Sequence, residues 1–168
     1  MKTTSQNFIF PVLQQITNNT TSWIGNRSRD NENIVTGQTF TAPSGGDLAA
    51  IEVFPCIVTK PGKVIMTLHH FDPQQKNWGP ALSTSTIDIN NTESGKWLAF
   101  DMQGAHLDQG RSYGFRLESP DAYIGVGEAA GSNAKPVFDG EEWQFTKKEN
   151  KGKCFAYFSL AFKIEMRA

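Results

Sequence analysis

The sequence predicts an all-β fold, a single-domain antiparallel β-sandwich that spans residues 1–168. Short stretches of alternating apolar and polar residues are separated by turns rich in Gly, Pro and Asn. These stretches recur about every 10–15 residues, as the strands of sandwiches and barrels do. No stretch of helical length carries apolar residues at a 3.6-residue period. A chain of 168 residues is one ordinary domain and can build a hydrophobic core without disulfides or metals.

The first two predicted strands flank a turn at residues 42–46. The segment 36–40 alternates in polarity, as a half-buried strand does. In the segment 47–54 the apolar positions change phase between Ala50 and Ile51. This change predicts either a bulge or a strand that is buried on both faces.

The central strands are predicted at 63–71 and 82–89. A Pro61-Gly62 turn opens the first of them, and its alternation places His69 and His70 on opposite faces. The second strand is rich in Thr, which favours strands.

Five further segments complete the predicted sandwich, and they span 96–102, 112–117, 123–126, 143–145 and 155–166. In the first of these, Trp97 stands beside Leu98 and Phe100, so we expect its ring to be buried in the core. Residues 1–35 are expected to form an irregular N-terminal segment. Residues 127–153 are Gly-rich and charged, and we expect a long loop there with 143–145 as its one strand-like island.

The charge balance argues against a nucleic-acid partner. The 16 basic and 17 acidic residues leave a formal net charge of −1, whereas proteins that bind a phosphate backbone carry an excess of Lys and Arg. The basic run 147–153 includes Glu149 and no aromatic residue, so we expect a solvated hairpin loop.

No membrane span is expected, because the apolar stretches are too short to cross a bilayer. The apolar patch at 8–13 is interrupted by Pro11 and makes a poor signal peptide. We therefore expect an extracellular or periplasmic protein if a leader has been removed, and otherwise a cytoplasmic one. Cys56 and Cys154 have no metal-binding spacing, and we expect free thiols in preference to a disulfide.

Several motifs resemble those of galactose-binding-like jelly-roll modules found in bacterial carbohydrate-degrading systems. The motifs that carry the resemblance are Gly37–Pro43, Gly46–Val53, Gly62–Leu68, Leu82–Thr86, Gly95–Phe100 and Leu107–Leu117. The resemblance covers residues 36–126 and the final strand. It implies a jelly roll more directly than it implies sugar binding, since one fold hosts many functions.

No catalytic residue is predicted. His69 and His70 cannot act on one ligand from opposite faces of a strand, and His106 lies in a turn. No spacing singles out a pair among the carboxylates, which include Glu52, Asp88, Asp101, Glu118 and Glu128. We expect Glu141 and Glu142 to form a solvated stretch, and nucleophile and phosphate-loop motifs are absent.

Aromatic residues in predicted loops are the candidate ligand-binding groups. Trp23, Trp78 and Trp143 lack a strand reason to be buried. Sugars stack their C–H faces on exposed aromatic rings, while polar side chains bind their hydroxyls. Calcium could be held by the oxygen-rich segment 30–33 or by Asp47, although composition alone supports it.

The sequence therefore favours a non-catalytic carbohydrate-binding-like accessory module that stacks a glycan on Trp23, Trp78 or Trp143. The alternative is a protein–protein interaction or structural β-sandwich module with no small ligand. A third reading, a sugar hydrolase or lyase, requires two carboxylates that face each other in one cleft.

Overall fold

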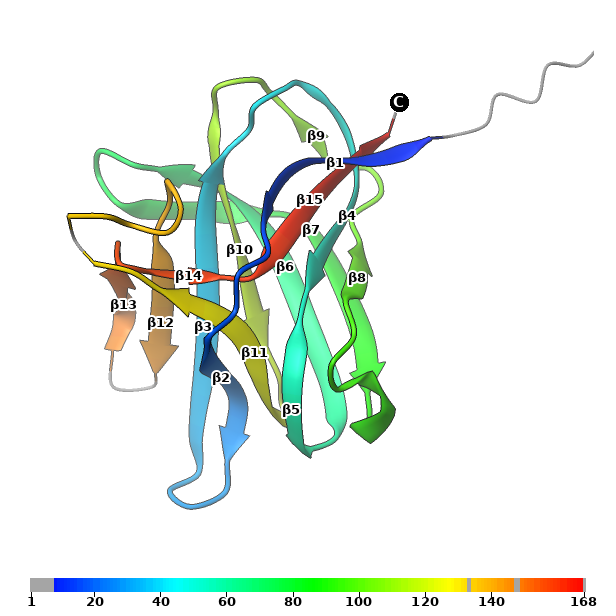
Figure 1. Ribbon diagram of the computed structural model, residues 1–168, viewed down its shortest axis with the longest axis vertical. Helices are drawn as coiled ribbons and strands as arrows, with labels where there is room; N and C mark the ends of the chain where they lie inside the picture. Colours follow the sequence, from blue (N-terminus) through cyan, green and yellow to red (C-terminus); the bar gives the residue numbers. More distant parts are fainter. Residues whose placement is uncertain (1–7, 133, 147–148, 168) are drawn as a thin grey trace, which may run out of the picture.

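The computed structural model describes residues 8–132, 134–146 and 149–167, with the backbone alone at 149–151 (Figure 1). Two antiparallel sheets form a sandwich, which confirms the predicted all-β class. Within these ranges the sole helical element is a 3-10 turn, η1 (Asn91–Glu93). The described part of the chain contains no helix with the length and apolar character that a membrane crossing requires.

The smaller sheet has the strand order β1-β15-β4-β8, with the short β9 paired to β4. Its strands are β1 (Ile9–Gln15), β4 (Gly46–Val53), β8 (Leu98–Asp101), β9 (His106–Leu107) and β15 (Phe162–Arg167). β1 is an edge strand that pairs only with β15, and the pairing shifts register between Pro11 and Leu13. Proline cannot donate to a ladder, so its place at an edge is the expected one.

The larger sheet has the order β14-β11-β2-β3-β10-β6-β7. These strands are β2 (Thr20–Arg27), β3 (Glu32–Thr41), β6 (Gly62–Asp72), β7 (Asn77–Ile89), β10 (Ser112–Glu118), β11 (Tyr123–Ala130) and β14 (Phe158–Leu160). Three strands lie off this path: β5 (Pro55–Lys60) pairs with β11, β12 (Glu142–Thr146) pairs with β3, and β13 (Glu149–Phe155) pairs with β12.

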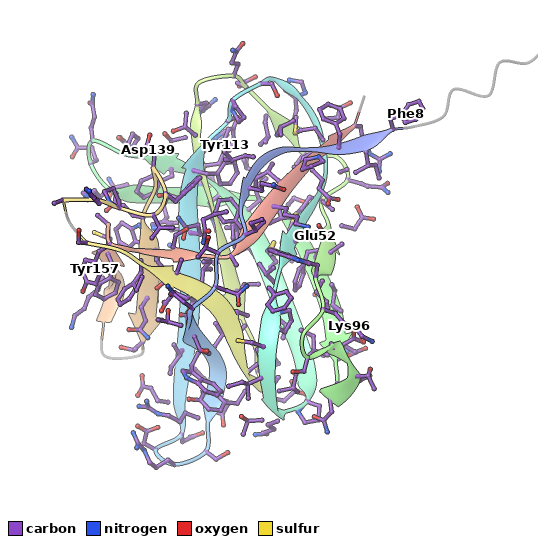
Figure 2. All side chains as sticks on the ribbon, viewed as in Figure 1. Phe8, Glu52, Lys96, Tyr113, Asp139 and Tyr157 are labelled. Carbon is purple, nitrogen blue, oxygen red and sulfur yellow. The ribbon has the colours of Figure 1, made fainter. Side chains whose placement is uncertain are left out.

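The main core fills the space between the two sheets. Its largest fully enclosed side chains are Phe40, Phe100, Tyr113, Phe115 and Phe162, and Figure 2 marks Tyr113 in this interior. The Tyr113 hydroxyl accepts a hydrogen bond from Asp108 N–H at 2.8 Å, which satisfies the polar end of a buried ring. Burial of each such aromatic side chain stabilises the fold by about 1.5–3 kcal/mol.

Alternation along the chain predicted most of these strands. The phase change in β4 is also confirmed, because Leu48 to Ile51 are all buried and the pairing with β15 shifts between Glu165 and Met166. His69 and His70 lie on opposite faces of β6, as expected: His69 is buried and His70 is half-buried.

Two expectations about irregular segments differ from the structure. Residues 1–35 contain β1, β2 and the start of β3, and residues 127–153 contain the end of β11, all of β12 and most of β13. β5 and β9 were also not predicted. These strands are short, polar or interrupted by proline, so their own sequence carries little alternation, and pairing with distant strands defines them.

Trp97 corrects another expectation. The alternation of its segment is as predicted, since Leu98, Phe100 and Met102 are buried. Trp97 precedes β8 and is only half-buried. Its ring contacts Phe54, with ring centres 5.3 Å apart, and the Lys163 ammonium lies 4.2 Å from its centre. Successive side chains along an extended strand point to opposite faces. Because Leu98 points into the core, Trp97 points away from it.

Both cysteines are free, as expected, and both are half-buried. Cys154 Sγ lies 3.8 Å from Lys76 Nζ, and Cys56 Sγ contacts the carbonyl of Gly125 at 3.4 Å. From the basic run 147–153, Lys147 and Lys148 lie outside the described residues.

Candidate functional site

β2 and β12 pair with successive residues along the same edge of β3 and then diverge. One edge of β3 pairs with β10. On the other edge, residues 32–34 pair with β2, and residues 35–38 pair with β12. We call the space between the diverging β2 and β12 the fork. The β12–β13 hairpin, drawn in orange, stands beside β3 in Figure 1.

Gly25 allows β2 to turn toward β11 at the base of the fork. Its φ is +104°, a left-handed conformation that glycine adopts without strain. A Cβ at this position would lie 1.9 Å from the carbonyl oxygen of Ala122. The same carbonyl accepts a hydrogen bond from Asn26 N–H at 2.8 Å, which fixes β2 on β11.

The fork encloses a hollow of about 230 Å³. The residues that line it are Thr21, Ser22, Trp23, Arg27, Ile34, Tyr123, Glu128, Glu142, Gln144, Phe155 and Phe158. They come from six strands, β2, β3, β11, β12, β13 and β14. Aromatic rings and hydrogen-bonding groups therefore converge in one concavity, which is the usual composition of a small-molecule site.

Trp23 and Tyr123 form the aromatic part of this hollow. Their rings are stacked, with centres 4.9 Å apart and planes inclined by 20°. The stack forms because Tyr123 pairs with Gly25, next along the same face from Trp23. Both side chains are half-buried, so part of each stays accessible from solvent.

Glu128 and Glu142 form the polar part. Both are buried, with 7% and 5% of their surface exposed. Glu128 Oε1 accepts a hydrogen bond from Thr20 Oγ1 at 2.7 Å. The Glu142 carboxyl lies close enough to Glu128 for the two groups to interact, and its Oε1 is enclosed without a hydrogen-bond partner among the described residues.

Burial raises the pKa of Glu142 to about 10, and the hydrogen bond and negative charge of Glu128 raise it further in the same direction. Glu142 is therefore protonated at neutral pH beside the Glu128 carboxyl. An enclosed acceptor without a donor costs free energy. A hydroxyl or amine donor on a ligand would satisfy Glu142 Oε1.

Arg27 closes the base of the fork. Its guanidinium donates to both carboxylate oxygens of Asp30, with Nε–Oδ1 3.0 Å and Nη2–Oδ2 2.6 Å. This contact lowers the pKa of Asp30 to about 2. The oxygens of the predicted calcium segment 30–33 are thus already engaged within the hairpin, since Asn31 and Asn33 both accept from Asn26.

Trp78 and Trp143 lie away from the fork, in a second apolar cluster. We call it the outer cluster; it consists of Phe71, Trp143 and Phe145 with the half-buried Val35, Trp78 and Cys154. The two Trp rings meet edge to face at 5.9 Å. Trp143 is 4% exposed, so its ring has no free face on which a sugar could stack.

Glu142 and Tyr123 are site residues that sequence reasoning missed. The expectation that Glu142 is solvated is wrong, because β12 places it opposite Gln38 and Phe155. The signal was present in the four residues 142–145: if Trp143 and Phe145 share one face of a strand, Glu142 and Gln144 share the other.

The histidines do not form a joint site. Each nitrogen of His69 has a partner, with Nδ1 2.9 Å from Gly79 O and Nε2 2.7 Å from Thr67 Oγ1. His106 Nδ1 lies 3.1 Å from Asp47, the other predicted calcium ligand. Among the described residues, no three His, Cys, Asp or Glu side chains cluster as metal ligands would.

No known family model matches the sequence, and no curated protein gives a significant match.

Proposed function

We propose that this protein is a non-catalytic carbohydrate-binding module with a galactose-binding-like jelly-roll fold, and that it binds a sugar in the fork. The single observation that carries the proposal is that Glu142 Oε1 is buried without a hydrogen-bond partner in the hollow that also holds the stacked rings of Trp23 and Tyr123. A sugar ring offers the two matching features, hydroxyl donors and an apolar C–H face.

The dimensions of the hollow suit a small ligand. Pockets for drug-sized molecules measure about 300–1,000 Å³, and the fork holds about 230 Å³. One sugar ring, or the end of a chain, fits this space better than a long oligosaccharide. Glu128, Glu142 and Gln144 supply both acceptors and donors for its hydroxyls.

The carboxyl pair supports binding rather than hydrolysis. Glycosidases hold their two carboxyl groups about 5–5.5 Å apart when they retain configuration and about 6.5–9.5 Å apart when they invert it. Glu128 and Glu142 interact closely enough for Glu142 to keep its proton at neutral pH. Carboxyl groups at either of the glycosidase separations are too far apart to hold a proton between them directly.

A glycan-array screen followed by titration of the best monosaccharide tests the proposal. Trp23→Ala is expected to weaken binding at least about tenfold, as loss of an aromatic contact at a binding site does. Trp97→Ala is the matched control, because Trp97 is also half-buried but contacts Phe54 and Lys163 away from the fork. Equal affinity of Trp23→Ala and wild type for every bound sugar would contradict the proposal.

The same array is run with calcium and with a chelator. Asp30 and Asp47 already contact Arg27 and His106, so we expect binding to the fork to be independent of calcium. A loss of binding in chelator would place an ion in the site.

One observation favours the alternative, a module that binds another protein. Phe8, Ile9 and Phe10 are 63%, 55% and 42% exposed, next to one another at the start of edge strand β1. Figure 2 shows Phe8 at the free end of this strand, clear of the sandwich. Exposed apolar residues on an unpaired edge favour association. A concentration-dependent dimer by light scattering that Phe8→Ser/Phe10→Ser abolishes would support this second function.

A further inference from the structure

The guanidinium of Arg116 packs into the angle between the Trp78 and Phe145 rings, which meet edge to face on the outer face of the larger sheet. Its central carbon lies 4.4 Å from the centre of the Trp78 ring and 4.1 Å from that of Phe145. Arg116 extends from β10, beside Gly114, where a Cβ would lie 2.5 Å from the Trp78 ring. Attachment to β10 and packing against the rings, one of which rests on Gly114, together fix the position of the Arg116 guanidinium.

The N–H groups of Arg116 have no partner within the described part of the chain. Among the residues whose side chains the structure describes, no carboxylate forms an ion pair with Arg116, and none accepts a hydrogen bond from it. Its Nε atom is enclosed without a hydrogen-bond partner. A guanidinium carries five N–H donors, and leaving a half-buried one unpaired costs free energy. Burial accordingly lowers the pKa of Arg116, although the nearby charge of Glu118 opposes this.

A hollow of about 300 Å³ opens beside this guanidinium. It is lined by Val35, Thr67, His69, Arg116, Glu118, Phe145 and Thr146. Burial lowers the pKa of His69 and so favours its neutral form, whose Nδ1 lies 2.9 Å from the Gly79 carbonyl oxygen and whose Nε2 lies 2.7 Å from Thr67 Oγ1. Among the described lining residues, Arg116 is the fixed cation and Glu118 the acid, and Glu118 is exposed and forms no ion pair with Arg116.

We propose that this hollow, which we call the arginine site, binds the carboxylate of an acidic ligand such as a uronic acid. A planar carboxylate matches the planar N–H pairs of a guanidinium and receives two parallel hydrogen bonds. The arginine site shares no lining residue with the fork. Its occupancy therefore does not depend on whether a neutral sugar binds in the fork.

The test is titration of the wild-type protein with glucuronate and with glucose, followed through the Arg116 Nε–H resonance. We expect a saturable shift with glucuronate and none with glucose. Because the probe atom belongs to the site itself, this arm needs no variant. If glucuronate leaves the resonance unmoved, the proposal is overturned whatever sugar binds in the fork.

Variants then assign the charge that matters. Arg116→Gln is expected to weaken glucuronate binding at least about tenfold, as loss of a charge-assisted hydrogen bond does. Glu118→Gln is expected to strengthen it, because it removes the negative charge that Glu118 places in the hollow. Arg111→Gln removes an exposed guanidinium that contacts Asp108 instead, and it should leave the affinity within about twofold of wild type.

Sulfate and phosphate provide the remaining arm. They carry oxyanions that also bind arginine, but they lack the planar pair of oxygens. Binding of either ion in preference to glucuronate would overturn the carboxylate assignment. Equal loss of glucuronate affinity in Arg116→Gln and Arg111→Gln would show a general charge effect and would also overturn the site.

Discussion

Glu142 on β12 and Glu128 on β11 are buried carboxyl groups that interact across the fork. Two buried carboxyl groups at hydrogen-bonding range cannot both be charged without a cation between them, so they keep one proton. Burial, reinforced by Glu128, raises the pKa of Glu142 to about 10. The pair therefore links the stability of the protein to pH, and it does so at the site we propose for sugar binding.

Glu142→Gln should remove this link. The ordinary pKa of the carboxyl is 4.5 and the folded value is about 10, so between these limits the folded protein binds one more proton than the unfolded chain. The free energy of unfolding contributed by Glu142 then falls as pH rises, by up to about 1.4 kcal/mol per pH unit. Urea unfolding at pH 5, 7 and 9 should show that the stability of Glu142→Gln relative to wild type increases with pH.

Glu141→Gln is the control for that series. Glu141 is the neighbouring carboxylate but contacts Lys76 at 2.6 Å instead of Glu128. The free energy of unfolding of Glu141→Gln should therefore vary with pH as that of the wild type does. Parallel curves for wild type and Glu142→Gln would show that Glu142 is ionised in the folded protein and would contradict the shared proton.

The fork illustrates what local sequence can and cannot predict here. Alternation in 63–71 correctly placed His69 and His70 on opposite faces, because that relationship depends only on the strand itself. The fork depends instead on β2 and β12 sharing one edge of β3. Alternation in 142–145 separates Glu142 from Trp143 and Phe145, but it does not show which distant strand β12 pairs with, so Trp23 was identified without Glu142, its polar counterpart.

The same limit explains the assignment of the other two Trp residues. Trp78 and Trp143 were selected because their flanking residues are polar, which is typical of loops. Their burial comes from each other and from Phe71 and Phe145, across β6, β7 and β12. An aromatic cluster assembled from separate strands cannot be distinguished from exposed loop aromatics by sequence pattern alone.

Gly114→Ala should disrupt the outer cluster. An added Cβ would lie 2.5 Å from two carbons of the Trp78 ring, which packs directly on Gly114. Such overpacking destabilises a protein by about 1–3 kcal/mol. Chemical unfolding measures the loss, and near-ultraviolet circular dichroism should report displacement of Trp78. Gly45→Ala is the control, because its Cβ meets only ordinary contacts of 3.4 Å and 3.5 Å; equal stability of the two variants would contradict the packing described.

Gln38→Leu should weaken the attachment of β14 to the larger sheet. Gln38 is fully buried, and its Oε1 accepts a hydrogen bond from Leu160 N–H at 2.9 Å. Its Nε2 donates to Thr39 O at 3.1 Å. Leucine leaves the Leu160 N–H buried without an acceptor, at a cost of about 1–3 kcal/mol. Faster amide exchange at Leu160 should accompany the loss, whereas Gln103→Leu, at an exposed position, should change neither measurement. Unaltered exchange at Leu160 in Gln38→Leu would rule out this role.

His69 should stay neutral in the folded protein at pH values where a free histidine is already charged. Burial lowers its pKa from the ordinary value of 6.5, and the charge of Arg116 acts in the same direction, while the hydrogen bond to Gly79 opposes them. The Gly79 carbonyl can only accept, so Nδ1 carries the proton and Nε2 accepts from Thr67. Nitrogen chemical shifts of the ring should therefore show the Nδ1–H tautomer at pH 6.5.

The effect of His69 on stability follows from the same contacts. Below pH 6.5 the unfolded chain takes up a proton that folded His69 resists, so its contribution to stability is lost as pH falls. Thr67→Val keeps the shape of the side chain but removes the donor to Nε2, which leaves that nitrogen free to bind a proton. This variant should raise the pKa of His69 and reduce the loss of stability in acid. If Thr67→Val leaves the His69 titration unchanged, the Thr67 hydroxyl does not hold the ring in its neutral form.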